Sequence, residues 1–216
     1  MKNKSLIIAL IVVCLLAVGC AKKKVVKNGD WVISLSETND FLDEDAKDAI
    51  ANYNKELKPV ALLGEQVVAG TNYMYLVCDS NSYKVVVIYK DLEGKMQVTK
   101  ISDFDVTKYA NENKSMNVET LVGGWTVNIP GKPMMLEGAV QAAFDEANGK
   151  IVGVTYYPIK VLATQEKDGT NYAILCYGKM SDANGTTGIY VETLYMTGNT
   201  NEVVSISSVD LKDFNQ

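Results

Sequence analysis

The chain has 216 residues, of which 26 are acidic and 21 are lysine with no arginine, so its formal net charge is −5. An acidic chain of this kind argues against nucleic acid or anionic lipid as a binding partner. The sequence also has no histidine, which removes the usual general base and the commonest transition-metal ligand. We therefore expect a protein that is not an enzyme and that uses no cofactor or metal.

The first twenty residues have the pattern of a targeting segment. Lys2 and Lys4 precede an unbroken apolar run at 6–18, which is followed by Gly19 and Cys20. The end of this run resembles a bacterial lipoprotein signal, in which the cysteine receives diacylglycerol and becomes the new N-terminus. The resemblance implies a signal peptide over 1–20, lipidation of Cys20 and a place on the extracytoplasmic face of a bacterial cell envelope. The alternative, a plain transmembrane anchor, would need roughly 20 apolar residues.

A helix and four strands are predicted after a tether at 21–28. Apolar residues that share one helical face at Ala46, Ala49, Ile50, Tyr53 and Leu57 predict the helix. The β-rich runs that follow are separated by turn residues and lie at 60–66, 73–78, 84–89 and 96–102. One helix followed by an antiparallel meander is typical of a small α+β unit.

The same series begins again after a polar stretch at 108–121, which is predicted to be a linker. A second apolar stripe falls at Leu136, Ala139, Val140, Ala143 and Ala147. It is followed by β-rich runs at 159–162, 172–177, 188–196 and 202–208.

An internal repeat explains why the series occurs twice. The residues at 66–73 recur in outline at 165–172, an offset of 99 positions, with the same Gln, the same Gly and the same Thr-Asn-Tyr. Trp31 and Trp125 mark the start of the two copies. The sequence therefore predicts an α+β protein of two tandem domains, each with one helix packed on a four-stranded antiparallel sheet, at 29–107 and 122–216.

The motif at 66–73, which follows a helix and lies at the first turn of a meander, resembles the cystatins, and its Gly-Thr-Asn-Tyr end resembles their stefin branch. The resemblance extends over each copy nearly end to end. It implies an inhibitor of papain-like cysteine proteases, in which this hairpin is the first binding loop and an N-terminal trunk ends in a glycine. The protease-binding residues that it implies are Gly29 in the trunk and Gln66, Val67, Val68, Ala69 and Gly70 in the loop.

An apolar hairpin tip also suits this role on physical grounds. Val67 and Val68 would expose apolar area at the tip, and Gly70 would give the backbone freedom that a tight turn needs. Docking in a protease cleft excludes substrate through shape and burial, so no catalytic group is required. The alternative is that the valines only continue a strand and that Gly70 forms a bulge.

Two departures from the cystatin pattern lie in the hairpins themselves. The second hairpin of a cystatin usually bears Pro-Trp, whereas this chain has Asp-Leu-Glu-Gly at 91–94 and Thr-Gly-Asn-Thr-Asn at 197–201, so a typical aromatic anchor is absent. The second copy also has Glu166, Lys167 and Asp168 in place of the apolar tip. Desolvating these charges would cost several kcal/mol, so the second copy is not expected to inhibit through this loop.

The third departure is the short tether between the lipidation site and the trunk. Gly29 lies nine positions after Cys20, which is at most about 30 Å of extended chain. A tether of this length would turn the loop toward the membrane that carries it. The departures favour an alternative function, a non-inhibitory cell-surface binding or scaffold module of the same fold.

Overall fold

The computed structural model describes residues 29–33, 43–110, 124–128, 136, 138–198 and 200–215. The predicted signal peptide with Cys20, the tether at 21–28 and most of the predicted linker at 108–121 lie outside these residues. Within the described part of the chain, no helix is both long enough and apolar enough to cross a membrane.

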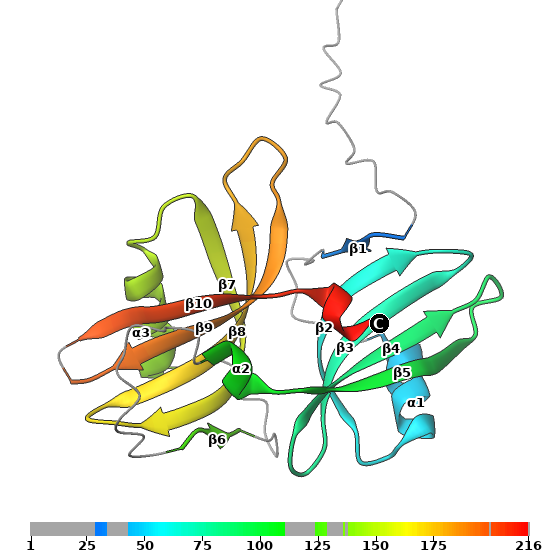
Figure 1. Cartoon of the computed structure of the whole chain (residues 1–216), viewed down its shortest axis with the longest axis horizontal. Helices are drawn as coiled ribbons and strands as arrows, with labels where there is room; N and C mark the ends of the chain where they lie inside the picture. Colours follow the sequence, from blue (N-terminus) through cyan, green and yellow to red (C-terminus); the bar gives the residue numbers. More distant parts are fainter. Residues whose placement is uncertain are drawn as a thin grey trace, which may run out of the picture.

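The first half forms an antiparallel sheet whose strands lie side by side in chain order (Figure 1). Helix α1 (Glu44–Tyr53) comes between the first and second strands. It begins after Asp43, whose carboxylate accepts a hydrogen bond from the backbone N–H of Asp45 at 2.9 Å and satisfies one of the free donors of the first turn. The strands are β1 (Trp31–Val32), β2 (Lys58–Val67), β3 (Thr71–Cys78), β4 (Tyr83–Lys90) and β5 (Met96–Phe104).

The second half repeats this order after helix α2 (Val106–Ala110). Its helix α3 (Gly138–Asn148) again comes between the first and second strands, and the chain ends in a short 3₁₀ helix, η1 (Leu211–Phe214). The strands are β6 (Thr126–Val127), β7 (Val154–Glu166), β8 (Thr170–Met180), β9 (Thr187–Met196) and β10 (Asn201–Val209), again side by side in chain order.

The predicted fold class is wrong, although the predicted strands coincide with β2–β5 and β7–β10. The described chain is mostly β, with two five-stranded antiparallel sheets and short helices, and it does not consist of two units of one helix on a four-stranded sheet. The fifth strand was missed because β1 and β6 each have two residues, too few for an alternating pattern. The first helix is also shorter than predicted, because the apolar stripe extends to Leu57 whereas α1 ends at Tyr53.

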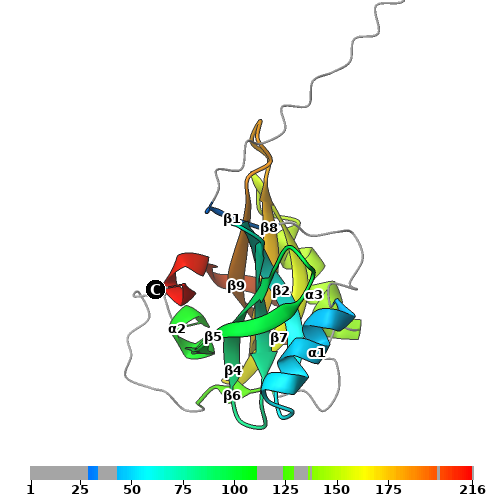
Figure 2. The same cartoon turned by 90° about the vertical axis from the view of Figure 1, so that its right-hand side faces the viewer.

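One face of each sheet is covered by the helix of its own half. Ala46, Ala49 and Ile50 of α1 pack on Tyr75, Val77, Val86 and Ile88 of the first sheet. In the second half, Ala143, Phe144 and Ala147 of α3 pack on Val161, Ile174, Cys176 and Leu194. Figure 2 shows α1 and α3 on one side of the molecule and α2 and η1 on the other.

The other faces of the two sheets meet in one shared core. This cluster contains Leu63, Leu76 and Val85 from the first sheet together with Leu162, Leu175 and Val191 from the second. Residues 74–78 of β3 are all buried, which is the pattern of a strand covered on both faces. The core therefore contains residues from both sides of the repeat boundary, and the separation into two domains at 29–107 and 122–216 stays a prediction.

The last helical turn of each half crosses to the other half (Figure 1). The carbonyl oxygens of Tyr109 and Ala110 in α2 accept hydrogen bonds from the hydroxyls of Ser207 at 2.6 Å and Thr193 at 3.1 Å. In the opposite direction, the ring of Phe214 stacks on Phe104 with 5.9 Å between the ring centres. Residues 108–110, expected to begin the linker, thus belong to a helix that fastens the halves together.

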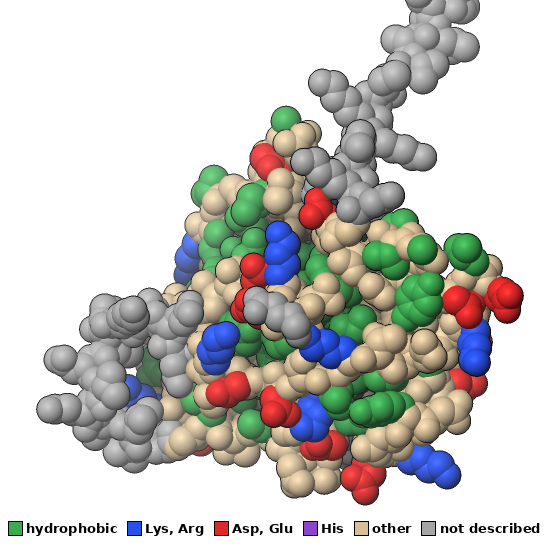
Figure 3. Space-filling model, turned by 45° about the vertical axis from the view of Figure 1, so that its right-hand side comes forward, with side chains coloured by type: hydrophobic (Ala, Val, Ile, Leu, Met, Phe, Trp, Pro, Cys, Tyr) green, Lys and Arg blue, Asp and Glu red, His purple; other side chains and the backbone are tan. Residues whose placement is uncertain are grey.

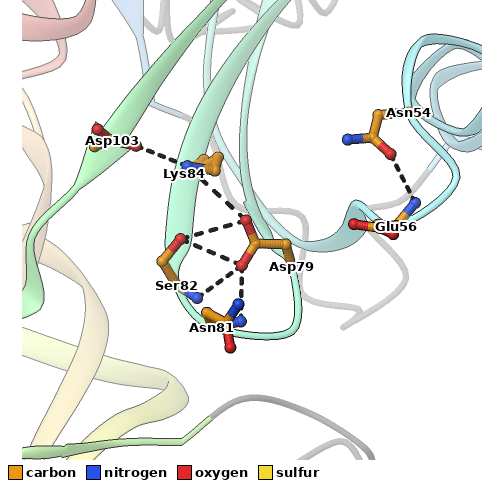
Figure 4. Close-up of polar contacts among 7 residues, drawn as sticks. All are labelled: Asn54, Glu56, Asp79, Asn81, Ser82, Lys84 and Asp103. Carbon is orange, nitrogen blue, oxygen red and sulfur yellow. Dashed lines mark hydrogen bonds and ion pairs between the residues drawn. The ribbon is translucent and has the colours of Figure 1, made fainter.

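The turn between β3 and β4 is organised by one carboxylate (Figure 4). Asp79 Oδ1 accepts hydrogen bonds from the backbone N–H groups of Asn81 and Ser82, both at 2.8 Å. Lys84, on the next strand, forms an ion pair with Asp103 at 2.7 Å and lies 3.9 Å from Asp79. This turn lies at the end of the sheet opposite the 66–73 motif, because β3 begins at Thr71 and ends at Cys78.

Candidate functional site

The tip of the β2–β3 hairpin presents two valines to solvent. Val67 is 48 % exposed and Val68 is 41 % exposed, and Ala69 is also exposed. Exposed aliphatic side chains that adjoin one another on a hairpin tip are a candidate contact surface for another protein. Val67 is the last residue of β2 and pairs with Thr71, as the alternative interpretation of the motif expected, whereas Val68 follows the strand. Both side chains are exposed in this arrangement.

The tip is held in one conformation by its own strand and by β4. The backbone N–H of Val68 donates to the carbonyl of Gly70 at 3.0 Å, and the Tyr89 hydroxyl donates to the carbonyl of Ala69 at 3.0 Å. A Cβ atom on residue 70 would lie 2.4 Å from the carbonyl oxygen of Lys90, closer than non-bonded atoms approach. Glycine is therefore required at residue 70, because β4 passes directly beside it.

Gln66 and Gly29, both implied as protease contacts, play different parts. Gln66 is only 7 % exposed. Its Nε2 donates to the carbonyl of Gly29 at 2.7 Å, and its Oε1 accepts from Nδ2 of Asn72 at 2.7 Å. Because the Gly29 N–H also donates to the carbonyl of Val67 at 3.2 Å, the structure brings Gly29 beside the hairpin tip.

A further apolar residue, Leu92, lies at the same end of the sheet. It is 87 % exposed in the β4–β5 turn, and this turn is next to the β2–β3 tip because Thr71 pairs with Lys90. Leu92 is not among the site residues expected from the sequence, where only the missing aromatic anchor marks this turn. An apolar residue in an otherwise polar turn was the signal that could have identified it.

The name apolar edge is used from here on for Gly29, the β2–β3 tip at 67–70 and Leu92. Figure 3 brings this end of the molecule toward the viewer and shows hydrophobic side chains at the surface with acidic side chains beside them. Glu93 is exposed next to Leu92. The Asp91 carboxylate is bound within its own turn, where it accepts hydrogen bonds from the N–H groups of Glu93 at 3.0 Å and Lys95 at 2.8 Å.

The second hairpin has the same internal bonds and a different tip. Asn171 donates to Gln165 at 3.0 Å, and Tyr195 donates to the carbonyl of Asp168 at 3.0 Å, as Asn72 and Tyr89 do in the first half. The exposed positions there are Glu166, Lys167 and Asp168. The residues that recur between the halves are thus those that shape the hairpin, and those that differ are the exposed residues of its tip.

Two other features of the described chain, a cavity and a pair of buried cysteines, do not belong to the apolar edge, although the cavity lining includes Asp30, which follows Gly29. A cavity of about 490 Å³ opens beyond β1 and is lined by residues of both halves, including Trp31, Ile33, Tyr190 and Leu211. Cys78 and Cys176 are free and buried, and burial raises the pKa of both thiols. Among the described residues, no three His, Cys, Asp or Glu side chains are grouped so as to hold a metal ion.

The comparisons with known proteins add no family to this description. Neither a scan of the chain against protein-family models nor a search of curated proteins found a match.

Proposed function

We propose that this chain inhibits papain-like cysteine proteases by inserting the apolar edge into the active-site cleft. The observation that carries the proposal is the exposure of Val67 and Val68, at 48 % and 41 %, on a hairpin tip that is fixed from both sides. The residues that would enter the cleft are Val67, Val68, Ala69 and Gly70, with Gly29 and Leu92 beside them. Gln66, which is buried, supports them from behind.

The physical requirements of such an inhibitor are modest. Burying the remaining exposed area of Val67, Val68 and Leu92 would contribute on the order of 4 kcal/mol. The rest must come from backbone contacts and from a tip that needs no reordering, because a preorganised loop avoids much of the entropy cost of association. The backbone enters the cleft as a folded turn, so no peptide bond is presented for attack and no catalytic group of the inhibitor is involved.

The proposal includes a lipid anchor at Cys20 on the outer face of a bacterial membrane. The span of about 30 Å between Cys20 and Gly29 keeps the apolar edge near that membrane. The target would then be a protease that acts at the cell surface. A protease inhibited equally well by the anchored chain and by a soluble form would show that the tether does not restrict access.

Titration of papain with the chain from residue 21 to 216 tests the proposal. This range keeps every described residue. Inhibition at micromolar concentration or below is expected, and Val68→Asp should abolish it, because a carboxylate would have to be desolvated in the cleft. The matched control is Lys167→Asp, which places the same side chain at the corresponding position of the second hairpin and should leave inhibition unchanged.

The absence of inhibition at high micromolar concentration would contradict the proposal. That result would favour the alternative of a non-inhibitory cell-surface binding or scaffold module. Equal losses in Val68→Asp and Lys167→Asp would mean that both hairpins take part, contrary to the expectation for the second half.

A further inference from the structure

Gln66 joins the N-terminal residues to the hairpin through two hydrogen bonds. Its Oε1 accepts from Asn72 and its Nε2 donates to the carbonyl of Gly29, each at 2.7 Å. We call this pair of bonds the glutamine bridge. It acts together with the bond from the Gly29 N–H to the carbonyl of Val67 at 3.2 Å, so both polar backbone groups of Gly29 are held by the strand that carries the tip.

We infer that Gln66 is a positioning residue, which holds Gly29 beside Val67 and makes the trunk and the tip one preformed edge. The inference rests on the proposed function and assigns to Gln66 a role other than contact with the protease. At 7 % exposure, Gln66 has almost no surface left for a partner. Its contribution to binding is to remove the entropy cost of ordering the trunk during association.

Asn72 sets the direction of the bridge. An amide has one acceptor oxygen and one donor nitrogen, so the bond from Asn72 to Oε1 leaves Nε2 to face Gly29. Asn72 is suited to this because it lies directly opposite Gln66 in the β2–β3 register. The same Gln–Asn pair recurs in the second hairpin, between Gln165 and Asn171 at 3.0 Å, where the tip is charged.

The substitution Gln66→Glu tests the bridge without removing side-chain volume. Glutamate still accepts the bond from Asn72, but it loses the donor to Gly29 and places an oxygen against the Gly29 carbonyl. Amide hydrogen exchange of residues 29–32 is then expected to become faster. Gln165→Glu is the matched control and should leave this exchange unchanged. Unchanged exchange in Gln66→Glu would overturn the inference, whether or not the chain inhibits a protease.

A comparison in a shortened chain separates positioning from direct contact. In the chain from residue 21, Gln66→Glu should weaken papain inhibition about tenfold, the usual effect of one lost hydrogen bond plus a repulsion. In a chain that begins at Trp31, which has no Gly29 to hold, the same substitution should have no effect. An equal loss in both chains would overturn the inference, because Gln66 would then act through the tip or the protease. Faster exchange together with a complete lack of papain inhibition would support the bridge and contradict the proposed function instead.

Discussion

Leu211, at the start of the last helical turn, packs directly against Gly64 in β2 of the other half. A Cβ atom on residue 64 would lie 2.7 Å from Cδ1 of Leu211 and 3.1 Å from the carbonyl oxygen of Val32. Leu211 is 3 % exposed, so it has little room to move away. The close approach of a leucine from one half to a glycine of the other shows that the two repeats are fitted together at atomic contact.

Gly64→Ala should therefore destabilise the whole chain. We expect a loss of about 1–3 kcal/mol, as in other overpacked cores, measured as the free energy of unfolding in urea. Gly198→Ala is the control, because a Cβ atom there meets nothing within 4 Å. A single unfolding transition that shifts for Gly64→Ala would show that both halves unfold together. Two transitions, of which only one shifts, would contradict that expectation.

A buried carboxyl under α3 predicts that stability depends on pH. Glu192 is 0 % exposed, and its Oε1 accepts one hydrogen bond from Asn148 at 2.9 Å, while Oε2 has no partner. Burial raises the pKa of Glu192 to about 7 from a usual value of 4.5. The carboxyl lies close to Cys176 and Tyr156, both of which are neutral near pH 7, and within the described part of the chain no cation contributes to its pKa.

The sign of the effect follows from the raised pKa. The folded chain holds the proton more tightly than the unfolded chain, so stability is greatest below about pH 4.5 with respect to this group and falls as the pH rises toward 7. The decrease should amount to at most about 3 kcal/mol. Glu192→Gln keeps the shape of the side chain without its charge. It should therefore flatten the decrease in the free energy of unfolding, measured in urea from pH 5 to 8. The same slope in Glu192→Gln and in the original chain would assign the pH dependence to another group.

The turn at Asp79 (Figure 4) predicts that stability also depends on pH in the acidic range. Hydrogen bonds, first of all from the backbone N–H of Asn81, lower the pKa of this carboxyl. A lowered pKa means that the stabilisation is present above the unfolded-state pKa of about 4 and is lost as the pH falls through the lower value of the folded chain. Asp79→Ala should cost about 1 kcal/mol at pH 7, and the cost should shrink as the pH falls toward 2.

Thermal unfolding of Asp79→Ala and Asp79→Asn at pH 7 and pH 2 checks this expectation. Asparagine keeps an acceptor oxygen for the N–H groups of Asn81 and Ser82, so Asp79→Asn should lose less stability than Asp79→Ala. A cost that stays constant with pH would show that the charge of the carboxylate does not matter to the turn.

Much of the local structure could be predicted from the sequence, because it depends on nearby residues. The repeat at 66–73 and 165–172 located both hairpins, and alternating or continuous apolar runs located eight strands. The second buried face of each sheet could also have been found. The run Tyr-Met-Tyr-Leu-Val-Cys at 73–78 has no polar positions, which is typical of a strand covered on both sides. The prediction of one helix on a sheet accounts for only one of these two buried faces.

The remaining features depend on contacts between residues far apart in the chain. Nothing near Ser207 indicates that its hydroxyl donates to the carbonyl of Tyr109, 98 positions away. The position of Gly29 beside Gln66 was expected only through the cystatin resemblance, and the buried state of Gln66 was not expected at all. Leu92 does not follow from the cystatin resemblance, because that resemblance points to an aromatic residue in this turn and the turn carries an exposed leucine instead.

Leu92 gives the last prediction, which concerns the apolar edge alone. Leu92→Ala should weaken papain inhibition about fivefold, because a leucine side chain that is 87 % exposed would lose about 1 kcal/mol of burial in the complex. Leu92→Trp should tighten inhibition, since an aromatic side chain at the edge of a cleft is a common hot spot. The control is Val152→Ala, because Val152 is 94 % exposed and lies outside the apolar edge, ahead of β7. If Leu92→Ala and Val152→Ala inhibited equally well, the β4–β5 turn would not touch the protease, and the tip at 67–70 with Gly29 would have to account for all of the binding.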